Sequence, residues 1–373
     1  MSITRLATRL MPRVAVALGG LILLASIPHG QAALEAVAAP QVAILPGDLD
    51  QPSDEGRLGT VWVVNRDRGE LTIFDARSGQ VLQRIFVGGG AHDICISERA
   101  GKAYITAEAI DTVTTVDTTT LALGTIPVGP LPHHVEPSYD GRFVYVSLAS
   151  HTSTVGAPQV AVIDTENESV TYMTTNASSS ARSHGPHPSF DGETLYVAHD
   201  IGNAVTAVNT GTGASNLTVG AIPRAEEVVP TRFGHLLWAS ARGDNTVKRI
   251  DLNTGTITAS VPVGGVQPES VLLTPSERTL IASLRGSPAA LAFIDTVELT
   301  LRGTIPIAGA GSAGDLAVIT PNGRFVYATF DKGITGTGGV AVVDVRTGTV
   351  VDSWVYPDTG RPHGVWYSRK GLR

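Results

Sequence analysis

A strand-turn-strand pattern recurs along this 373-residue chain and constrains its fold more than any other feature. The clearest copy runs from Pro132 to Ser147 and contains the dipeptide Asp140-Gly141, and similar copies span residues 184–198 and 315–329. Asp-Gly or Asn-Gly between β-rich segments is typical of a tight hairpin turn. The chain therefore predicts many short antiparallel strands built on one repeated plan.

A second marker gives the number of copies. A β-rich run ends in Asp or Asn at intervals of 42 to 49 residues, at Asp75, Asp117, Asp164, Asn209, Asp251, Asp295 and Asp344. A period of this length, with room for four short strands, is the signature of a β-propeller blade. We predict an all-β fold, a seven-bladed β-propeller with four antiparallel strands per blade.

The two ends of the repeat region complement each other. Residues 363–368 repeat only the first strand of a copy, whereas residues 61–64, 71–75 and 81–87 supply the other three strands. Pairing them closes the last blade with N- and C-terminal strands together and leaves no free sheet edge. We therefore predict one propeller domain over residues 58–373 and reject two separate domains.

The first 57 residues do not follow the repeat. Arg5, Arg9 and Arg13 precede an apolar run over residues 14–27, and a small-residue cleavage site precedes Ala33. This pattern indicates a signal peptide over residues 1–32. A membrane anchor is the alternative, but the apolar run is short for a span. Residues 33–57 are interpreted as a linker, and the mature protein is expected in the periplasm or secreted.

Charge and cysteine content limit the partners. Cleavage would remove three arginines and no acid, which moves the formal charge from −7 to −10. An acidic domain argues against nucleic acid as a partner. The single cysteine, Cys95, cannot form an internal disulfide, and we expect it to pack as a small apolar residue. We expect a monomer that does not associate with the membrane after cleavage.

Two segments carry a family resemblance. Residues 140–147 (DGRFVYVS) and 160–165 (VAVIDT) resemble the YVTN or YncE-like family of seven-bladed β-propellers. The resemblance covers residues 58–373 and implies the propeller fold. It implies no single activity, because the family includes binding proteins, proteins of unknown role and relatives of lactonases and lyases.

One position of the repeat is always ionisable. Five residues before the Ser or Thr that precedes the first turn of each copy, the chain carries His92, His133, His184, Glu226, Glu269, Asp315 and His363. In a propeller this strand is innermost, so one such residue per blade forms a ring at a mouth of the central channel. Histidines occupy one arc of the predicted ring and carboxylates the other.

These side chains suit a metal. Imidazoles on neighbouring strands can bind Zn, Cu, Ni or Fe, and carboxylates can complete the coordination shell. A metal would also offset the three acids, which otherwise raise one another's pKa. The alternative is that polar residues at a channel mouth only organise water. We interpret the seven residues as a site for a divalent transition metal (Zn, Cu or Fe).

Further polar residues are expected at the same mouth. His134, His187 and Glu227 flank the ring positions, and the loops between the second and third strands of each copy contribute Arg66, Asp67, Glu108, His151, His199, Asp200, Arg242, Asp244, Arg285, Asp331 and Lys332. As a group they predict a polar funnel for a small polar or anionic ligand. The glycine-rich loop over residues 331–339 is interpreted as a flap.

Three functions fit this ring. The first is a binding protein for a metal or a metal-bearing small polar ligand. The second, implied by the family resemblance, is a metal-dependent lactone hydrolase or lyase, with His133 or His363 as general base and Glu226, Glu269 or Asp315 on the metal. The third is a protein-interaction scaffold with a passive ring. The chain lacks a Gly-x-Ser-x-Gly elbow, a Walker loop, a Rossmann fingerprint and a Cys-x-x-Cys-His motif, which argues against serine-nucleophile and covalent haem chemistry.

Overall fold

The propeller occupies the described part of the chain. The computed structural model describes residues 57–149, 159–175, 182–264, 266–333, 336–357 and 360–372. The predicted signal peptide (1–32) and all but the last residue of the predicted linker (33–57) lie outside these ranges. Among the described residues, no helix is long and apolar enough to cross a membrane.

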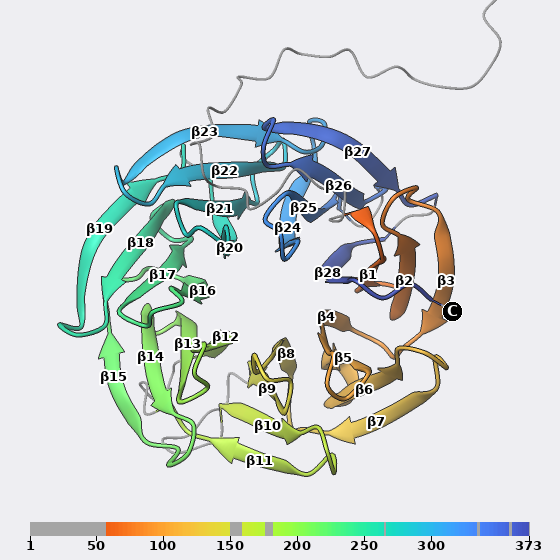
Figure 1. Ribbon diagram of the computed structural model, residues 1–373, viewed down its shortest axis with the longest axis horizontal. Helices are drawn as coiled ribbons and strands as arrows, with labels where there is room; N and C mark the ends of the chain where they lie inside the picture. Colours follow the sequence, from red (N-terminus) through yellow and green to blue (C-terminus); the bar gives the residue numbers. More distant parts are fainter. Residues whose placement is uncertain are drawn as a thin grey trace, which may run out of the picture. The chain divides into compact units, whose positions relative to one another are not determined.

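Seven four-stranded antiparallel sheets are arranged around a central axis (Figure 1). The first three blades are β4 (Ala91–Ser97), β5 (Lys102–Ala107), β6 (Thr112–Asp117) and β7 (Leu123–Pro127); β8 (Pro132–Pro137), β9 (Phe143–Leu148), β10 (Val160–Asp164) and β11 (Val170–Met173); and β12 (Arg182–Pro188), β13 (Thr194–Ile201), β14 (Ala204–Asn209) and β15 (Ser215–Val219). A short 3-10 helix, η2 (Glu108–Ile110), follows β5.

The remaining blades keep the same order. They are β16 (Ala225–Pro230), β17 (Leu236–Ala241), β18 (Thr246–Asp251) and β19 (Thr256–Pro262); β20 (Pro268–Leu273), β21 (Thr279–Leu284), β22 (Ala290–Asp295) and β23 (Thr300–Pro306); β24 (Ala313–Ile319), β25 (Phe325–Asp331), β26 (Gly339–Asp344) and β27 (Thr349–Val355); and β28 (Pro362–Ser368), β1 (Thr60–Asn65), β2 (Glu70–Asp75) and β3 (Val81–Phe86). The predicted all-β, seven-bladed fold is confirmed.

The last blade joins both ends of the propeller. β28 pairs antiparallel with β1, with Thr60 opposite Ser368 and Trp62 opposite Trp366. The sheet order β28-β1-β2-β3 is the predicted closure. Because this joint gives β1 a partner, the innermost strands form an unbroken circle around the channel.

The repeated Asp or Asn has a structural role. In each copy its side-chain Oδ1 accepts backbone N–H groups from the turn after the third strand. Asp117 accepts from Thr119 (2.9 Å) and Thr120 (2.7 Å), and Asn209 accepts from Thr212 (2.9 Å). This is the Asx-turn geometry, which only a short side chain with an acceptor oxygen can provide. The sequence marker therefore reflects turn chemistry and not function.

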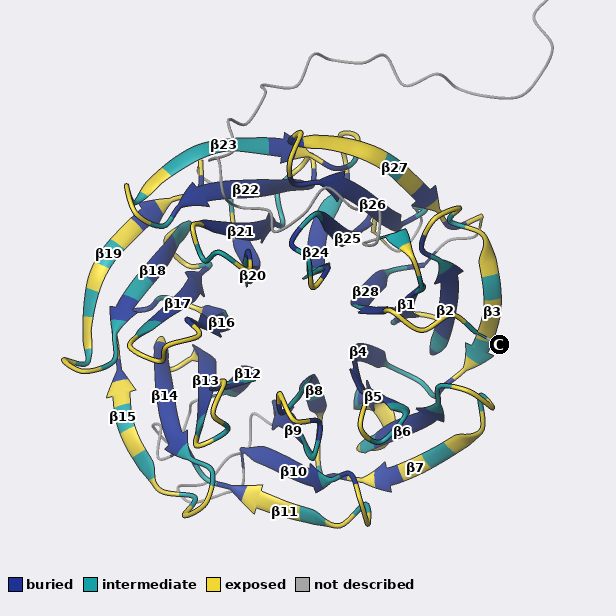
Figure 2. Ribbon diagram, viewed as in Figure 1, coloured by how far each residue is buried: buried dark blue, intermediate teal, exposed yellow. Residues whose placement is uncertain are grey.

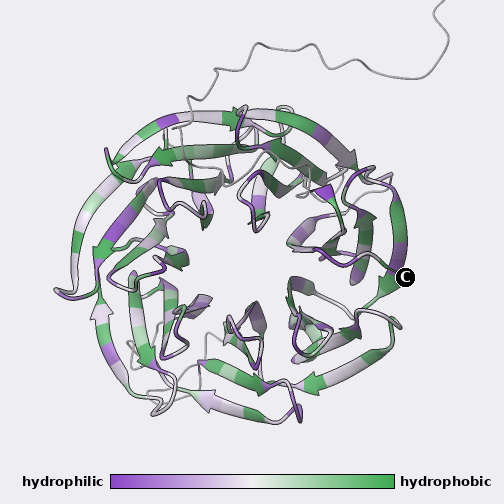
Figure 3. Ribbon diagram, in the orientation of Figure 1, coloured by the Kyte–Doolittle hydropathy of each residue, from purple (hydrophilic) through white to green (hydrophobic). Residues whose placement is uncertain are grey.

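The apolar core lies between the blades. One cluster joins Leu291 and Phe293 of β22 to Val326 of β25 and Val343 of β26, and each of these residues is fully buried. The inner three strands of each sheet are mostly buried and the outermost strand alternates toward solvent (Figure 2). Hydrophobic residues accordingly concentrate along the strands and hydrophilic ones at loops and the channel (Figure 3).

Candidate functional site

A β-bulge at the same place in all seven innermost strands builds the site. Two residues of the first strand lie opposite a single residue of the second, as where His92 and Asp93 face Thr106 and where His133 and His134 face Ser147. The same shift occurs in the other five blades. A bulge interrupts the alternation of side chains, so a ring residue and the residue after it can both approach the channel.

Buried hydroxyl groups hold the bulges in place. The residue opposite the bulge is Ser or Thr in five blades. Ser240 Oγ accepts the backbone N–H of Glu227 (2.9 Å) and donates to the carbonyl of Glu269 in the next blade (2.7 Å). Thr106 likewise donates to the His133 carbonyl at 2.7 Å. These bonds satisfy buried backbone groups and connect neighbouring blades at the ring.

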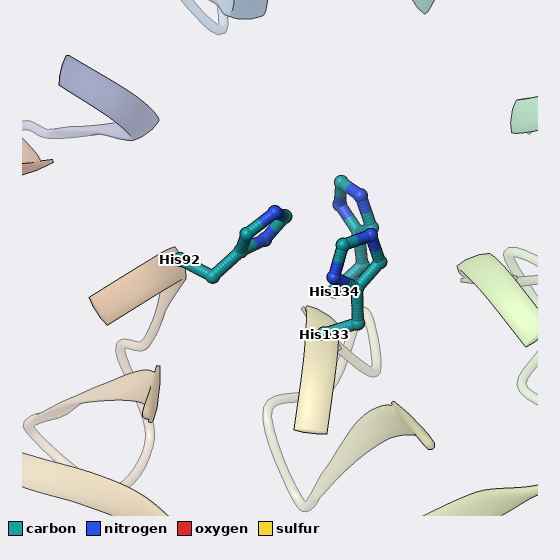
Figure 4. A group of neighbouring side chains, drawn as sticks. All are labelled: His92, His133 and His134. Carbon is teal, nitrogen blue, oxygen red and sulfur yellow. The ribbon is translucent and has the colours of Figure 1, made fainter. Parts of the chain in front are cut away.

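The structure brings all seven predicted ring residues together. Six are at most 5 % exposed, and His133 is half-buried. Ring centroids are 3.8 Å apart for His363 and His92, 3.9 Å for His92 and His133, and 4.6 Å for His133 and His184. Figure 4 shows His92 from β4 and His133 and His134 from β8 directed into the same space. We call His363, His92, His133 and His184 the histidine arc, and Glu226, Glu269 and Asp315 the acidic arc.

Two histidines have their Nδ1 atoms engaged. His133 Nδ1 lies 2.5 Å from Glu108 Oε1, and His184 Nδ1 lies 2.9 Å from the backbone carbonyl of Glu226. A carboxylate and a carbonyl only accept, so both imidazoles donate through Nδ1–H. In the blade before Glu226 the usual hydroxyl is replaced by Ala198, and His184 provides the missing donor. Nε2 is therefore the remaining ring nitrogen of each, and it carries a lone pair whenever the imidazole is neutral.

These lone pairs converge. The two Nε2 atoms of His133 and His184 are 3.1 Å apart, and Glu226 Oε2 lies 2.8 Å from His184 Nε2. Three acceptors so close repel one another unless a proton on His184 or a cation lies among them. Two nitrogens bound to one zinc ion at about 2.0–2.1 Å are about 3.3 Å apart in a tetrahedral shell. The observed separation fits that arrangement.

Three groups of side chains have the spacing of metal ligands. They place one ligand atom each within 4.8 Å of the others and consist of His92, His133 and His134; His134, His184 and Glu227; and His184, Glu226 and Glu269. Five of the seven predicted metal ligands belong to them, whereas Asp315 and His363 do not. Among the described residues the groups add His134 and Glu227, which the sequence placed only as neighbours of the ring.

Arginines neutralise the acidic arc. Arg242 Nη1 lies 3.0 Å from Glu226 and 3.3 Å from Glu269, and Arg285 Nη1 lies 3.4 Å from Glu269 and 3.3 Å from Asp315. The three carboxylates therefore have cationic partners within the protein. The expectation that a metal would offset all three acids is not needed here, because the guanidinium groups perform that role.

The carboxylates differ in their pKa values. Burial raises the pKa of Glu226, but His184 and Arg242 outweigh it and lower the value to about 2. Burial, together with neighbouring carboxylates, raises the pKa of Glu269 and of Asp315 to about 6 in spite of Arg285. Glu226 is thus a permanent carboxylate at neutral pH, and the other two titrate near it.

Three members of the histidine arc are held neutral. Burial, followed by repulsion from neighbouring imidazoles, lowers the pKa of His92, His133 and His363 well below 6.5. His134 differs from them. Burial opposes its charged form, but Glu227 and Asp93, at 3.0 and 3.2 Å from its Nδ1, raise its pKa well above 6.5. Neutral imidazoles are the form that binds metals.

The mouth above the ring is a polar cavity of about 350 Å³. Of the predicted loop residues, Arg66, Glu108, Arg242 and Arg285 line it. His199 instead bonds Thr206 (2.8 Å) away from the mouth. The predicted contributor His151 and part of the predicted flap, residues 334–335, lie outside the described residues.

One lining residue was missed from the sequence. Arg182 begins β12 and pairs with Asp200, with its Nε 2.8 Å from Oδ1. Its place two residues before His184 is a signal that could have identified it. Arg224 and Arg361 hold the same position, two residues before Glu226 and His363, so the repeat itself carried this signal.

The fold is shared with several solved structures. A chain of Kuenenia stuttgartiensis hydrazine synthase matches with a TM-score of 0.64 and 17 % identity, covering 82 % of this chain and 100 % of that one. Dihydro-heme d1 dehydrogenase NirN in complex with DHE matches with a TM-score of 0.59 and 15 % identity, covering 87 % and 78 %. A proposed 6-phosphogluconolactonase from Bacteroides uniformis gives 0.65 and 15 %, covering 84 % and 100 %.

At these identities the similarity shows the propeller fold and no activity. No family model and no curated protein matches the chain. The resemblance to the YVTN or YncE-like family therefore stays a prediction at the level of the family, while the seven-bladed architecture is supported by the solved structures.

Proposed function

We propose that this protein is an exported β-propeller that binds one divalent transition metal ion at the histidine arc. The observation that carries the proposal is the pair of Nε2 atoms on His133 and His184, 3.1 Å apart, with both Nδ1 atoms already engaged. The protein has thus fixed both tautomers so that the lone pairs face one point. Such orientation of ligand imidazoles by carboxylates and carbonyls is characteristic of metal sites.

The remaining ligands would come from the immediate neighbours. His92 lies beside His133. Glu226 Oε2 is buried, and among the described residues the only donor that could reach it is a proton on His184 Nε2. Imidazole with carboxylate is a donor set suited to Zn, Cu or Fe and less to Mg or Ca, which prefer oxygen ligands alone. The mouth cavity leaves room for a small polar ligand beside the metal.

Metal analysis of protein purified without an affinity tag tests the proposal. We expect close to one equivalent of metal in the parent protein and none in the double variant His133→Ala, His184→Ala. His235→Ala provides the matched control, because His235 is an exposed residue of the turn between β16 and β17 and does not belong to the ring. Equal metal content in the double variant and the parent protein would refute the site. Export is supported by the pattern of residues 1–32 and is tested by locating the mature N-terminus.

A metal-dependent lactone hydrolase or lyase acting at the same mouth is the second candidate. The observation that favours it is the pair Glu269 and Asp315, whose pKa values of about 6 suit proton transfer at neutral pH. His363 and His133 are neutral and could accept a proton, and Glu226 could hold the metal. A screen of lactones and cyclic esters should then show turnover that Glu269→Gln reduces at least about 100-fold. Equal turnover by Glu269→Gln and the parent protein would exclude this candidate.

A further inference from the structure

The channel continues beyond the ring into a second cavity, which we call the lower chamber. It has a volume of about 160 Å³ and is lined by residues one to four positions after the ring residues in several blades, including Asp93, His134, Glu136, Glu227 and Trp366. A cavity of about 150 Å³ accommodates a benzene molecule. The lower chamber therefore has room for one small organic molecule.

One wall of the lower chamber is acidic. Asp93, Glu136 and Glu227 line it, whereas no Arg or Lys does. Asp93 is already used by the fold: its carboxylate accepts the backbone N–H groups of Ile94 (2.8 Å) and Val135 (3.1 Å). His134 lies between Asp93 and Glu227. One imidazole, whose raised pKa favours its cationic form, thus faces three carboxyl groups, and the acidic groups of this wall outnumber the basic one.

Neighbouring glycines leave space for the acidic side chains of this wall. A Cβ at Gly185 would lie 2.2 Å from Glu227 Oε2, and a Cβ at Gly364 would lie 2.8 Å from Asp93 Oδ1. Glycine at these two positions is what admits both carboxylates beside the axis. His134 is 2 % exposed, and its Nε2 has no hydrogen-bond partner. Glu136 also lines the chamber, and burial together with Asp93 and Glu227 raises its pKa well above 4.5.

The opposite wall is apolar. Leu272 of β20, Leu316 and Val318 of β24, and Trp366 of β28 line it. The rim is aromatic on the acidic side: His187 lines the chamber and lies 3.3 Å from the hydroxyl of Tyr139, which stacks on Phe190 with centroids 4.0 Å apart. Tyr139 is 49 % exposed and Phe190 39 %, so the rim reaches solvent.

Charge and polarity select the class of ligand. An anion would meet three acidic side chains, and the only cationic partner among the lining residues, His134, is already paired with Asp93 and Glu227. A wholly apolar molecule would leave the Glu136 carboxyl group without a hydrogen-bond partner, which is costly. A bare metal ion is better held by the histidine groups above, none of which includes Glu136. An organic cation satisfies both walls, since its charge faces the acids and its body contacts the apolar side chains.

We propose that the lower chamber binds a small primary amine, with its ammonium group between Glu136 and Glu227 and its apolar body against Leu316, Val318 and Trp366. The chamber is lined by none of the seven ring residues, although His134 and Glu227 also belong to groups with metal-ligand spacing. The two ends of one channel would then recognise two different classes of cation, a metal ion and an organic ammonium group.

Calorimetric titration with benzylamine, benzyl alcohol and benzoate tests the proposal. These probes share one apolar body and differ in the charge of the polar end. The protein is used whole, after metal has been removed with a chelator. We expect benzylamine to bind at least about tenfold more tightly than benzyl alcohol, and benzoate not to bind. Equal affinity for amine and alcohol, or no binding of the amine, would overturn the proposal.

Variants locate the site. Glu136→Gln should weaken benzylamine binding at least about tenfold, because a neutral amide replaces the charged partner. Glu193→Gln is the control, since Glu193 is an exposed carboxylate of the turn after β12. Trp366→Leu should also weaken binding while the circular dichroism spectrum stays that of the parent. Unchanged affinity in Glu136→Gln would refute the site. Benzylamine binding should persist in the double variant His133→Ala, His184→Ala, and its loss there would assign the amine to the ring mouth instead.

Discussion

Both arcs of the ring contain buried ionisable groups, and the two arcs satisfy the charge and hydrogen bonds of these groups in different ways. In the acidic arc, Arg242 and Arg285 stand between successive carboxylates and supply the missing charge. In the histidine arc, Glu108 and a backbone carbonyl hold the Nδ1 atoms of His133 and His184, and the Nε2 atoms face each other without a cation. The acidic arc has its counter-charges within the protein. The histidine arc has ligand atoms positioned for a cation that the protein itself does not supply.

This difference distinguishes ionisable groups that stabilise the fold from ionisable groups that are positioned to bind a ligand. A buried ion pair that closes on itself contributes to one folded arrangement and demands little else. Converging lone pairs, in contrast, cost free energy until a cation or proton reaches them. The ring members that belong to the groups with metal-ligand spacing include three of the four histidines. The two arcs meet at both ends, where His184 contacts Glu226 and His363 contacts Asp315.

The largest expected effect is on the acidic arc. Arg285→Ala removes the cation shared by Glu269 and Asp315, which are 2 % exposed each. Asp315 would lose its guanidinium partner and Glu269 would keep only Arg242, which should lower the free energy of unfolding by about 3 kcal/mol at neutral pH, measured by urea denaturation. Arg346→Ala, at an exposed arginine, is the control. A loss no greater than that of the control would mean that the acidic arc is not neutralised as described.

Glu108→Gln probes the histidine arc. The neutral amide orients His133 less firmly than the carboxylate does, so we expect metal affinity to fall about 10- to 100-fold. The measurement is competition with a chelator of known affinity. Glu166→Gln, in an exposed ion pair with Arg99, serves as the control. If both variants retain the parent affinity, Glu108 does not position a ligand.

The histidine arc and Glu269 of the acidic arc should respond to acid with opposite signs, whereas Glu226, with its pKa lowered to about 2, should follow the histidines. His92, His133 and His363 have pKa values well below 6.5, so below about pH 6.5 the unfolded chain binds more protons and the folded state loses stability. Glu269 has a pKa raised from 4.5 to about 6, so its contribution falls as pH rises through that window, by about 2 kcal/mol at most.

Glu269→Gln separates these contributions. The variant should lose stability on acidification from pH 6 to 4.5 more steeply than the parent protein, because the compensating carboxylate is gone. Urea denaturation at a series of pH values gives the two slopes. A slope that is unchanged or shallower would contradict the raised pKa of Glu269.

The smallest effect concerns the contacts that link blades. Ser240→Ala removes the hydroxyl that bonds Glu227 N–H and the Glu269 carbonyl, and should cost about 1 kcal/mol of unfolding free energy. Ser169→Ala, at an exposed position, should cost less than half as much. Equal values for the two variants would show that the hydroxyl contributes nothing at the bulge.

Sequence reasoning reached the fold because its signals are local and repeated. The Asp or Asn at each third-strand end, the Asp-Gly turns and the complementary ends predicted the blades and their closure. The ring was found in the same way, since His92 and its counterparts hold one position of the repeat. Their metal-binding role remains a prediction.

The rest of the site depends on features that alternation and alignment do not show. Side chains of successive strand residues normally point to opposite faces of a sheet. The sequence therefore identified His134 and Glu227 only as neighbours of the ring, and not as residues that also face the channel. The bulge changes this, and its only sequence trace is the Ser or Thr opposite it. Arg242 and Arg285 come from loops of variable length, and their approach to the acids requires coordinates.

The closure of the last blade has a consequence for the order of folding. His363 lies on β28, which enters the circle only by pairing with β1 from the opposite end of the domain. This is the contact of greatest sequence separation in the propeller, and such contacts form late because of their loop-closure entropy. Six members of the ring can come together as the blades form in chain order. The seventh, His363, joins them only when β28 pairs with β1, so a complete ring forms only in the fully folded propeller.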